Sequence, residues 1–295
     1  MDKITVIGAG TMGNGIAHHF SLFNYSVSLI DIDDSRLDNA KNVILQNMDR
    51  QVKKGVIQPR DKSKAFENIT FSKSIEDAED SLLIIEAITE NIQLKKEILK
   101  GLGSFIKKGS FVASNTSSIS ITELSSVLKT PSRFIGMHFM NPVPIMPLVE
   151  VINGYNTSSE TTEAIKAIVL DLGKTPVIVN DYPGFVSNRI LMPLINEAIQ
   201  TLFEGVAGVE EIDNVMKLGM SHPMGPLQLA DFIGLDVCLS IMEVLYKGFG
   251  NPKYAPCPLL VNMVSAGKLG KKSSHGFYDY SNSSKELVVS HQFLK

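Results

Sequence analysis

Several signals of specialised chemistry are scarce in these 295 residues, and each shortage excludes a class of protein. The two cysteines, Cys238 and Cys257, form no CxxC pair, so the sequence predicts neither a zinc site nor a disulfide framework. The histidines show no ligand-like clustering, and we therefore expect no bound metal. No stretch reaches the ~18 consecutive apolar residues that a membrane-spanning helix needs.

Charge of one sign is also in short supply. The formal net charge is −3, and no basic run is long enough to indicate nucleic-acid binding. The first strand-like segment begins at Ile4, which leaves no room for a signal or transit peptide, so the expected location is the cytoplasm. With 44% hydrophobic and 20% charged residues, a chain of this length can bury a large core and is expected to form two domains.

The most informative part of the sequence is its first 31 residues. An apolar run from Ile4 to Ile7 is followed at once by Gly8-Ala9-Gly10-Thr11-Met12-Gly13. A helical stretch then extends to about residue 24, and a second apolar run ends on Asp31. This is the GxGxxG dinucleotide fingerprint inside a βαβ unit, with an acid after the second strand. A lone GxGxxG would also fit an ordinary glycine-rich turn, and the surrounding pattern is what favours a cofactor.

Each position of this fingerprint has a physical role. Gly8 permits the tight turn out of the strand, Gly10 lets the backbone approach a pyrophosphate, and Gly13 lets the helix pack closely on the sheet. The N-terminus of that helix offers N–H groups and a partial positive charge to the phosphates. Asp31 can accept hydrogen bonds from ribose hydroxyls and would repel a 2′-phosphate. NAD is therefore favoured over NADP as the cofactor.

Strand-like and helix-like segments alternate through most of the chain and then give way to helices alone. The alternation predicts an α/β fold with a mostly parallel sheet, and the change near 181–184 predicts a Rossmann-type domain, 1–183, followed by an all-helical C-terminal domain, 184–295. The expected strands are 4–7, 27–31, 82–86, 111–114, 134–139, 148–152 and 176–179. The expected helices are 12–24, 35–54, 60–66, 91–101, 119–128, 158–172, 185–204, 209–218, 226–248 and 257–267.

His138 and Glu150 are the candidates for acid–base chemistry. They lie in two expected strands joined by the proline-rich stretch 142–147, which cannot form a helix and should loop back. A carboxylate beside an imidazole fixes its tautomer and stabilises the imidazolium. Such a pair can take the proton of an alcohol while hydride leaves for NAD. The alternative is a core histidine with satisfied hydrogen bonds and a solvated Glu150.

Other polar groups each have two interpretations. The run Ser114-Asn115-Thr116-Ser117-Ser118 after an expected strand suits ligand binding, but a cap for the helix 119–128 is the simpler explanation. Asn188, early in an apolar helix, either binds ligand or bonds a neighbouring backbone group. Glu90 and Lys95 fit an ordinary surface ion pair.

Taken together, the motifs resemble those of the short-chain L-3-hydroxyacyl-CoA dehydrogenases, and among them the bacterial 3-hydroxybutyryl-CoA dehydrogenases. The resemblance runs from Ile4 to about Tyr280. Its markers, in chain order, are Val6-Ile7-Gly8-Ala9-Gly10-Thr11-Met12-Gly13, Ala113-Ser114-Asn115-Thr116-Ser117-Ser118, Met137-His138-Phe139-Met140-Asn141-Pro142, Pro183-Gly184-Phe185-Val186, Met216-Lys217-Leu218-Gly219 and Gly276-Phe277-Tyr278-Asp279-Tyr280.

The resemblance implies a role for each candidate. It makes His138 the catalytic base and Glu150 the carboxylate that orients it. It implies that Ser117 bonds the 3-oxygen of the substrate and that Asn188 lies near the reacting thioester. It also implies a homodimer, formed by the helical domain through apolar stretches such as 232–245. Residues that it implies for NAD, beyond the glycine loop and Asp31, are Glu90, Lys95, Ser117, Asn141 and Lys272; for the acyl-CoA they are Ser117, Arg50 and Lys54.

Three positions depart from the family pattern. The usual second phenylalanine after the histidine is Met140, a lysine common before the Leu-Val-Glu strand is Pro147, and a common glycine is Ser274. The last of these changes lies two residues from Lys272. None removes a residue that the chemistry requires.

The expected activity is NAD-dependent oxidation of a short (S)-3-hydroxyacyl-CoA, such as 3-hydroxybutyryl-CoA, to the 3-oxoacyl-CoA, and the reverse. One alternative is a dehydrogenase for a small hydroxy acid without CoA, similar to gulonate dehydrogenases, which would not need Arg50 and Lys54. For these two residues a solvated helix end is the simpler explanation. Another alternative is a non-enzymatic role, as in crystallin-like relatives, against which the intact His138, Glu150, Ser117 and Asn188 argue.

Overall fold

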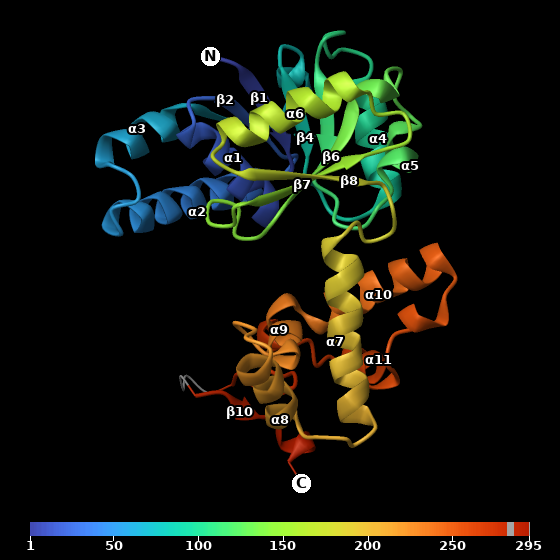
Figure 1. Cartoon of the computed structure of the whole chain (residues 1–295). Coiled ribbons are helices and arrows are strands. Elements are labelled where there is room, and N and C mark those ends of the chain that lie inside the picture. The colour runs from blue at the N-terminus through green and yellow to red at the C-terminus, as the bar shows by residue number, and fades with distance from the viewer. Residues whose placement is uncertain (282–285, 295) are drawn as a thin grey trace. The chain divides into compact units, whose positions relative to one another are not determined.

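The computed structural model describes residues 1–281 and 286–294 and divides into two compact units, Met1–Tyr182 and Pro183–Lys295 (Figure 1). The first unit is built on an eight-stranded sheet in the order β3-β2-β1-β4-β5-β6-β7-β8. All neighbouring strands are parallel except β6 and β7, which are antiparallel. The strands are β1 (Lys3–Ile7), β2 (Ser26–Ile30), β3 (Ile69–Ser72), β4 (Leu83–Glu86), β5 (Phe111–Ser114), β6 (Phe134–Phe139), β7 (Leu148–Asn153) and β8 (Thr175–Asn180).

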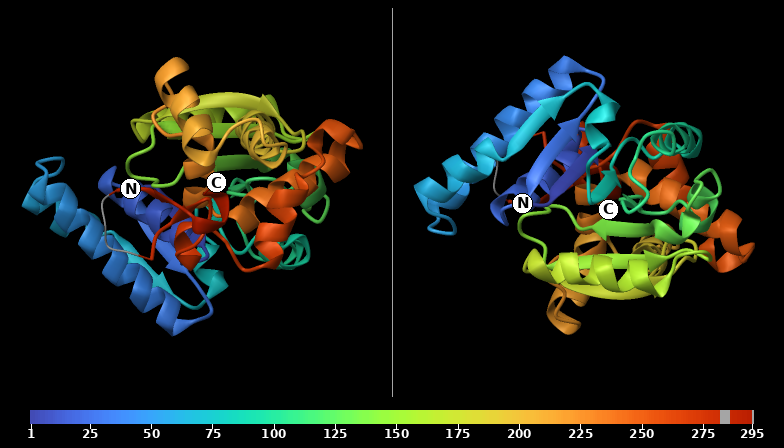
Figure 2. Two further views of the ribbon diagram at one scale, coloured as in Figure 1. Left: turned by 90° about the horizontal axis from the view of Figure 1, so that it is seen from below. Right: turned by 90° about the horizontal axis from the view of Figure 1, so that it is seen from above.

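Helices cover both faces of this sheet, as the views in Figure 2 allow the reader to follow. Alternate side chains of a strand point to opposite faces. Leu83 and Ile85 of β4 belong to one core together with residues of α1, α2 and α6. Glu86 points the other way, because it bonds Lys95 of α4. The helices are α1 (Thr11–Leu22), α2 (Asp34–Lys53), α3 (Pro59–Glu67), α4 (Ile92–Leu102), α5 (Ile121–Ser125) and α6 (Ser159–Asp171).

The second unit has its own apolar core, formed between its helices. Two buried carboxylates tie its elements together. Asp231 accepts hydrogen bonds from the backbone N–H groups of Phe277 and Tyr278. Asp213 accepts hydrogen bonds from the backbone N–H groups of Leu227 and Gln228 and from the Tyr278 hydroxyl. The elements are α7 (Ser187–Phe203), α8 (Val209–Asn214), the π-turn Val215–Gly219, α9 (Pro226–Ile233), α10 (Leu235–Phe249), α11 (Pro258–Ser265) and a two-stranded hairpin, β9 (Tyr278–Asp279) with β10 (Val288–Val289).

The predicted fold class is confirmed, with corrections at particular elements. The second unit is not wholly helical, since the short hairpin β9–β10 closes it. The helix expected over 226–248 is two helices, divided at Gly234, whose φ of +105° breaks the helical path. The helix expected over 119–128 is shorter, Ile121–Ser125. Strand β3 was not expected at all, because only its first residue, Ile69, is buried.

Candidate active site

The predicted acid–base pair forms across two antiparallel strands. In the register of β6 and β7, His138 lies directly opposite Glu150, so the two side chains share one face of the sheet. The imidazole Nδ1 lies 2.7 Å from Glu150 Oε2. His138 is 9% exposed and Glu150 only 2%. A buried carboxylate this close to Nδ1 holds the proton there, which leaves Nε2 as the nitrogen that can exchange a proton with a substrate.

The loop between these strands is held from behind by a buried lysine. The Lys174 ammonium donates hydrogen bonds to the carbonyls of Val143 and Met146, at 2.6 and 2.8 Å. The next residue, Thr175, donates its N–H to the carbonyl of Pro147. Burial lowers the pKa of Lys174 to about 8. The loop that connects the two catalytic strands and carries Asn141 is therefore anchored at three carbonyls.

The three glycines of the fingerprint differ in what the fold demands of them. Gly8 has a φ of +105°, and a Cβ there would lie 2.7 Å from the carbonyl oxygen of Ala87. A Cβ on Gly13 would lie 1.7 Å from the carbonyl oxygen of Gly8. At Gly10, by contrast, a Cβ would meet no atom of the described residues within 4 Å. The fold therefore explains Gly8 and Gly13 but not Gly10, whose missing side chain leaves room for something outside the chain.

Two cavities meet at this glycine loop. One, of about 450 Å³, is lined by Gly8, Gly10, Asp31 and apolar residues such as Ile88 and Leu94. The carboxylate of Asp31 accepts hydrogen bonds from the backbone N–H groups of Ala9 and Asp33 and is thereby fixed at the mouth of the loop. An aromatic base against the apolar wall, with its ribose at Asp31 and its phosphates at the loop, fits this set of groups.

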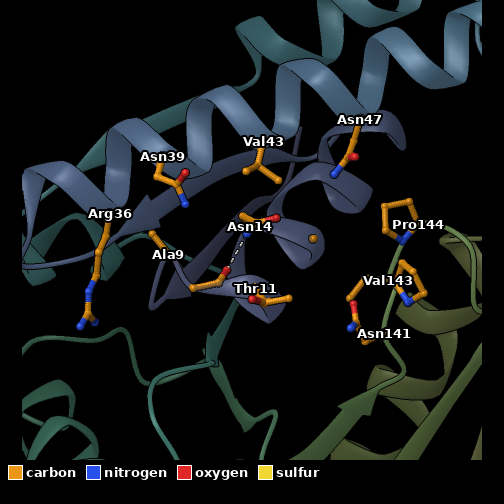
Figure 3. A pocket seen from close by; sticks show the side chains of 13 residues that line it. Ala9, Thr11, Asn14, Arg36, Asn39, Val43, Asn47, Asn141, Val143 and Pro144 are labelled. Atoms are coloured by element: carbon orange, nitrogen blue, oxygen red, sulfur yellow. Dashed lines mark hydrogen bonds between the residues drawn. The ribbon is translucent and has the colours of Figure 1, made fainter. Parts of the chain in front are cut away.

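The second cavity, of about 350 Å³, is lined by thirteen residues, of which four are asparagines (Figure 3). Asn14 lies at its floor and donates to the carbonyl of Gly10. The loop residue Asn141 closes one side, and helix α2 supplies the wall above with Arg36, Asn39, Val43 and Asn47.

Sequence reasoning missed this wall of α2. The residues 36, 39, 43 and 47 follow a spacing of three or four, which places them on one face of the helix. Arg50 and Lys54 continue the same spacing, and Arg50 donates to Asn47 Oδ1 at 3.1 Å. The signal was therefore present as a polar helical stripe, but an exposed polar stripe alone does not reveal which surface it faces.

The structure places Ser117 in a network that also differs from expectation. Glu90 Oε1 accepts hydrogen bonds from the Thr116 hydroxyl and from the backbone N–H groups of Ser117, at 2.9 Å, and Ser118, at 3.2 Å. The run 114–118 is therefore not the cap of α5; that cap is Ser120, which accepts from the N–H of Glu123.

Nor do Glu90 and Lys95 form a surface ion pair. Lys95 is 1% exposed and its ammonium lies 2.7 Å from Glu86 Oε1 and 3.3 Å from Glu90 Oε2. Desolvation by itself raises the pKa of Glu90, but the Lys95 charge and the hydrogen bonds from residues 116 and 117 outweigh it, and the net pKa is lowered. Glu90 is thus held as a carboxylate.

Comparison with known proteins agrees with this geometry. The family model of the 3-hydroxyacyl-CoA dehydrogenase NAD binding domain matches residues 3–182, and the model of the 3-hydroxyacyl-CoA dehydrogenase C-terminal domain matches 184–280. The chain belongs to the 3-hydroxyacyl-CoA dehydrogenase family. It is therefore an NAD-dependent oxidoreductase, and the predicted cofactor is confirmed.

Relatives within this family are similar over nearly the whole chain. The 3-hydroxybutyryl-CoA dehydrogenase of Bradyrhizobium diazoefficiens is 52% identical over 94% of this chain and 95% of its own length. A probable 3-hydroxybutyryl-CoA dehydrogenase of Bacillus subtilis is 51% identical, covering 94% and 97%. The crystal structure of an (S)-3-hydroxybutyryl-CoA dehydrogenase from Ralstonia eutropha superposes with a TM-score of 0.93, at 48% identity, over 96% of this chain and 100% of that one.

Two residues that the family resemblance assigns to the site lie in the second unit. Asn188 is the second residue of α7 and is buried. Lys272 is half-exposed and forms an ion pair with Asp236, at 2.6 Å. Close to it, Ser274 takes the left-handed conformation, with φ of +61°, which is the backbone conformation that glycine adopts most easily. The parts that Asn188 and Lys272 play in the site stay predictions.

Metal-binding clusters and membrane-spanning helices are both missing from residues 1–281 and 286–294. Within these ranges no group of three or more His, Cys, Asp or Glu side chains has the arrangement of a metal site. None of the helices in the same ranges combines the length and the apolar character of a transmembrane segment.

Proposed function

We propose that this chain interconverts (S)-3-hydroxyacyl-CoA and 3-oxoacyl-CoA with NAD, and that its substrate is short, of the 3-hydroxybutyryl-CoA class. The observation that carries the reaction is the buried His138–Glu150 pair on the sheet that also carries the glycine loop. The similarity to 3-hydroxybutyryl-CoA dehydrogenases over nearly the whole chain supports the substrate class.

In the direction of oxidation, His138 Nε2 takes the proton of the 3-hydroxyl group. Bound NAD would supply the acceptor for the hydride that leaves C3 as the C3–H bond breaks. Glu150 stabilises the imidazolium that results and keeps its plane fixed. In the reverse direction the imidazolium returns the proton to the alkoxide that forms at C3.

The remaining residues hold the two ligands. We propose that Asp31 binds the adenosine ribose, that residues 8–13 bind the pyrophosphate, and that Asn141, Lys272 and Glu90 contact the nicotinamide half. Lys95, buried behind Glu90, contributes to cofactor binding through that carboxylate. Ser117 bonds the 3-oxygen of the substrate and Asn188 lies near its thioester.

The stripe along α2 is the proposed path of the CoA moiety. The second cavity beside the glycine loop, with its four asparagines, opens onto the same helical face that carries Arg50 and Lys54. Amides suit the polar pantetheine and ribose groups, and the two cations at the end of the stripe suit phosphates. A carboxylic acid without CoA would have no use for this stripe.

We further propose a cytoplasmic homodimer that associates through the second unit. The stretch 232–245, expected to form the interface, packs mainly into that unit's own core, since Leu235, Cys238 and Leu245 are fully buried. Within this stretch Phe232 and Val237 are nonetheless exposed, at 60% and 40%, and further exposed apolar residues lie on and beside α8. They are Val206, Val215, Leu218 and Met220, with exposures of 71%, 61%, 83% and 62%.

The first test follows NADH oxidation with acetoacetyl-CoA in the wild type and in His138→Ala. We expect turnover by the wild type and a loss of about 10²–10⁴-fold in kcat in the variant, as is typical of a general acid–base residue. Turnover of free acetoacetate but not of its CoA ester would favour a CoA-free hydroxy-acid dehydrogenase. NADH binding without turnover of either would favour the non-enzymatic role.

The CoA path has a matched test. Arg50→Glu/Lys54→Glu should raise KM for acetoacetyl-CoA and leave KM for NADH unchanged. Lys41→Glu/Lys64→Glu makes the same change of charge at two exposed positions off the stripe and should leave both constants unchanged. An equal effect of the two double variants would mean that Arg50 and Lys54 act only through the overall surface charge and do not contact the CoA.

A further inference from the structure

The side chains behind Ser117 form a chain of contacts that reaches from the centre of the sheet to the substrate site. Glu86, at the end of β4, is fully buried. It accepts hydrogen bonds from the Lys95 ammonium, from the backbone N–H of Ile88 and from the Ser114 hydroxyl, at 2.7, 2.7 and 2.6 Å. The loop that carries Ile88 and the strand that carries Ser114 fix the carboxylate of Glu86. Glu86 in turn fixes the ammonium of Lys95.

Lys95 in turn fixes the position of the Glu90 side chain. A buried ammonium is stabilised by more than one carboxylate, and the second one here is Glu90. Glu90 itself sits after β4 and is half-exposed, so without the lysine its side chain would be able to turn into solvent. With the lysine in place, Oε2 points to the ammonium and Oε1 to the loop 116–118.

Several donors of the loop 116–118 converge on one oxygen of Glu90. Glu90 Oε1 accepts from two backbone N–H groups and from the hydroxyls of Thr116, Ser117 and Ser118. Thr116 is buried and in turn accepts from the N–H groups of Ser118 and Ile119. The backbone of Ser117 is therefore anchored to an acidic side chain from another strand's end and not to regular secondary structure.

We infer that Glu86 and Lys95 are positioning residues for the reaction: through Glu90 they hold the backbone of Ser117 where its hydroxyl meets the 3-oxygen of the substrate. The inference rests on the proposed function, because it takes the role of Ser117 from it. Neither Glu86 nor Lys95 touches the substrate in this scheme. Their effect is on geometry, and displacement of a positioning group by about 1 Å can cost about 10²-fold in rate.

The test compares single and paired substitutions. Lys95→Met leaves Glu86 buried without its cation, which risks unfolding the protein. Glu86→Gln/Lys95→Met removes both buried charges and leaves Glu90 without its counterion, so it isolates the loss of positioning. Lys96→Met removes the neighbouring lysine, whose partner Glu123 is on the surface, and is the matched control.

We expect Glu86→Gln/Lys95→Met to fold with a melting temperature near that of the wild type and to lose about 10²-fold in kcat/KM for acetoacetyl-CoA. In a Ser117→Ala background, measured at saturating NADH, the same pair should cost no more than about twofold, because the group that it positions is already gone. Amide exchange at residues 117 and 118 should become faster in the folded variant, and Lys96→Met should change none of these quantities.

Other results would overturn the inference. A full loss of activity on top of Ser117→Ala would show that the pair acts elsewhere. An effect confined to KM for NADH, with kcat unchanged, would show that the pair acts only through the cofactor contact of Glu90 and not through Ser117. Unchanged amide exchange at residues 117 and 118 would show that the pair does not hold the backbone of Ser117, whatever the kinetic result. A wild type that does not reduce acetoacetyl-CoA would instead contradict the proposed function, and the exchange measurement would still report on the anchor.

Discussion

At the scale of single residues, similar amino acids in one motif have different causes. Gly8 and Gly13 are required by the packing of the chain on itself, whereas Gly10 faces space. Glu86, Glu90 and Glu150 are all near the site, yet one is a buried anchor, one a half-exposed acceptor for a loop and one a partner of the catalytic imidazole. A residue's type therefore does not reveal its role until its neighbours are known.

The glycines give a prediction that separates folding from cofactor binding. Gly10→Ala should fold normally, because a Cβ there meets no described atom within 4 Å and its φ of −67° suits alanine. It should nonetheless weaken NADH binding, since the methyl group occupies the space that the pyrophosphate approaches. Gly13→Ala should lower the melting temperature sharply, because its Cβ would overlap the carbonyl of Gly8. Melting curves and NADH titration measure the two effects, and normal affinity in Gly10→Ala would contradict the assignment.

At the scale of elements, α1 combines a ligand-facing N-terminus with two buried histidines. His18 Nε2 donates a hydrogen bond to Gln51 Oε1, and His19 Nε2 donates one to the carbonyl of Leu172. Burial lowers the pKa of each to about 4, and the Lys174 charge adds to the shift at His19. The folded protein therefore keeps both imidazoles neutral at a pH where the unfolded chain would protonate them.

These two lowered pKa values make the stability of the folded protein depend on pH. Between pH 6.5 and about 4 the unfolded state binds more protons than the folded one, so these histidines make the protein less stable as the pH falls. Each fully buried histidine adds a slope of up to about 1.4 kcal/mol per pH unit. His19→Gln keeps a donor for the Leu172 carbonyl and should flatten the fall in urea midpoint between pH 7 and pH 5. Equal slopes in both proteins would contradict the pKa shifts. Asp231, whose pKa burial raises to about 6, acts in the opposite sense and is unchanged in this comparison.

At the scale of the whole molecule, the sequence predicted most of what periodicity can carry. Three features could be predicted, because each depends on neighbours within one or two elements. They are the βαβ fingerprint, the alternation of strands and helices, and the pairing of His138 with Glu150. The buried state of Lys95 was not legible, since it depends on Glu86 and Glu90 meeting α4 in three dimensions. The wall of Asn39 and Asn47 was hidden for the same reason, and the division at Gly234 needed a backbone angle that no pattern specifies.

The proposed homodimer is tested at this scale as well. Leu218→Glu places a charge at the most exposed apolar side chain of the surface on and beside α8. We expect sedimentation to show the wild type at twice the chain mass and the variant at a lower mass. Val56→Glu, at a similarly exposed apolar residue of the first unit, is the control and should remain associated. A wild type at the mass of one chain would contradict the dimer outright.

Because His138 and Glu150 both lie in strands, an insertion or deletion of one residue in either strand would separate the catalytic pair. Removal of one residue within β6 before His138 would turn the imidazole to the opposite face, among the side chains that pack on α1 and α6. A shift in β7 would do the same to Glu150. The connecting loop cannot compensate for a change of length either, because Lys174 and Thr175 bind it at three defined carbonyls. Changes of length in this lineage should therefore fall outside 134–150.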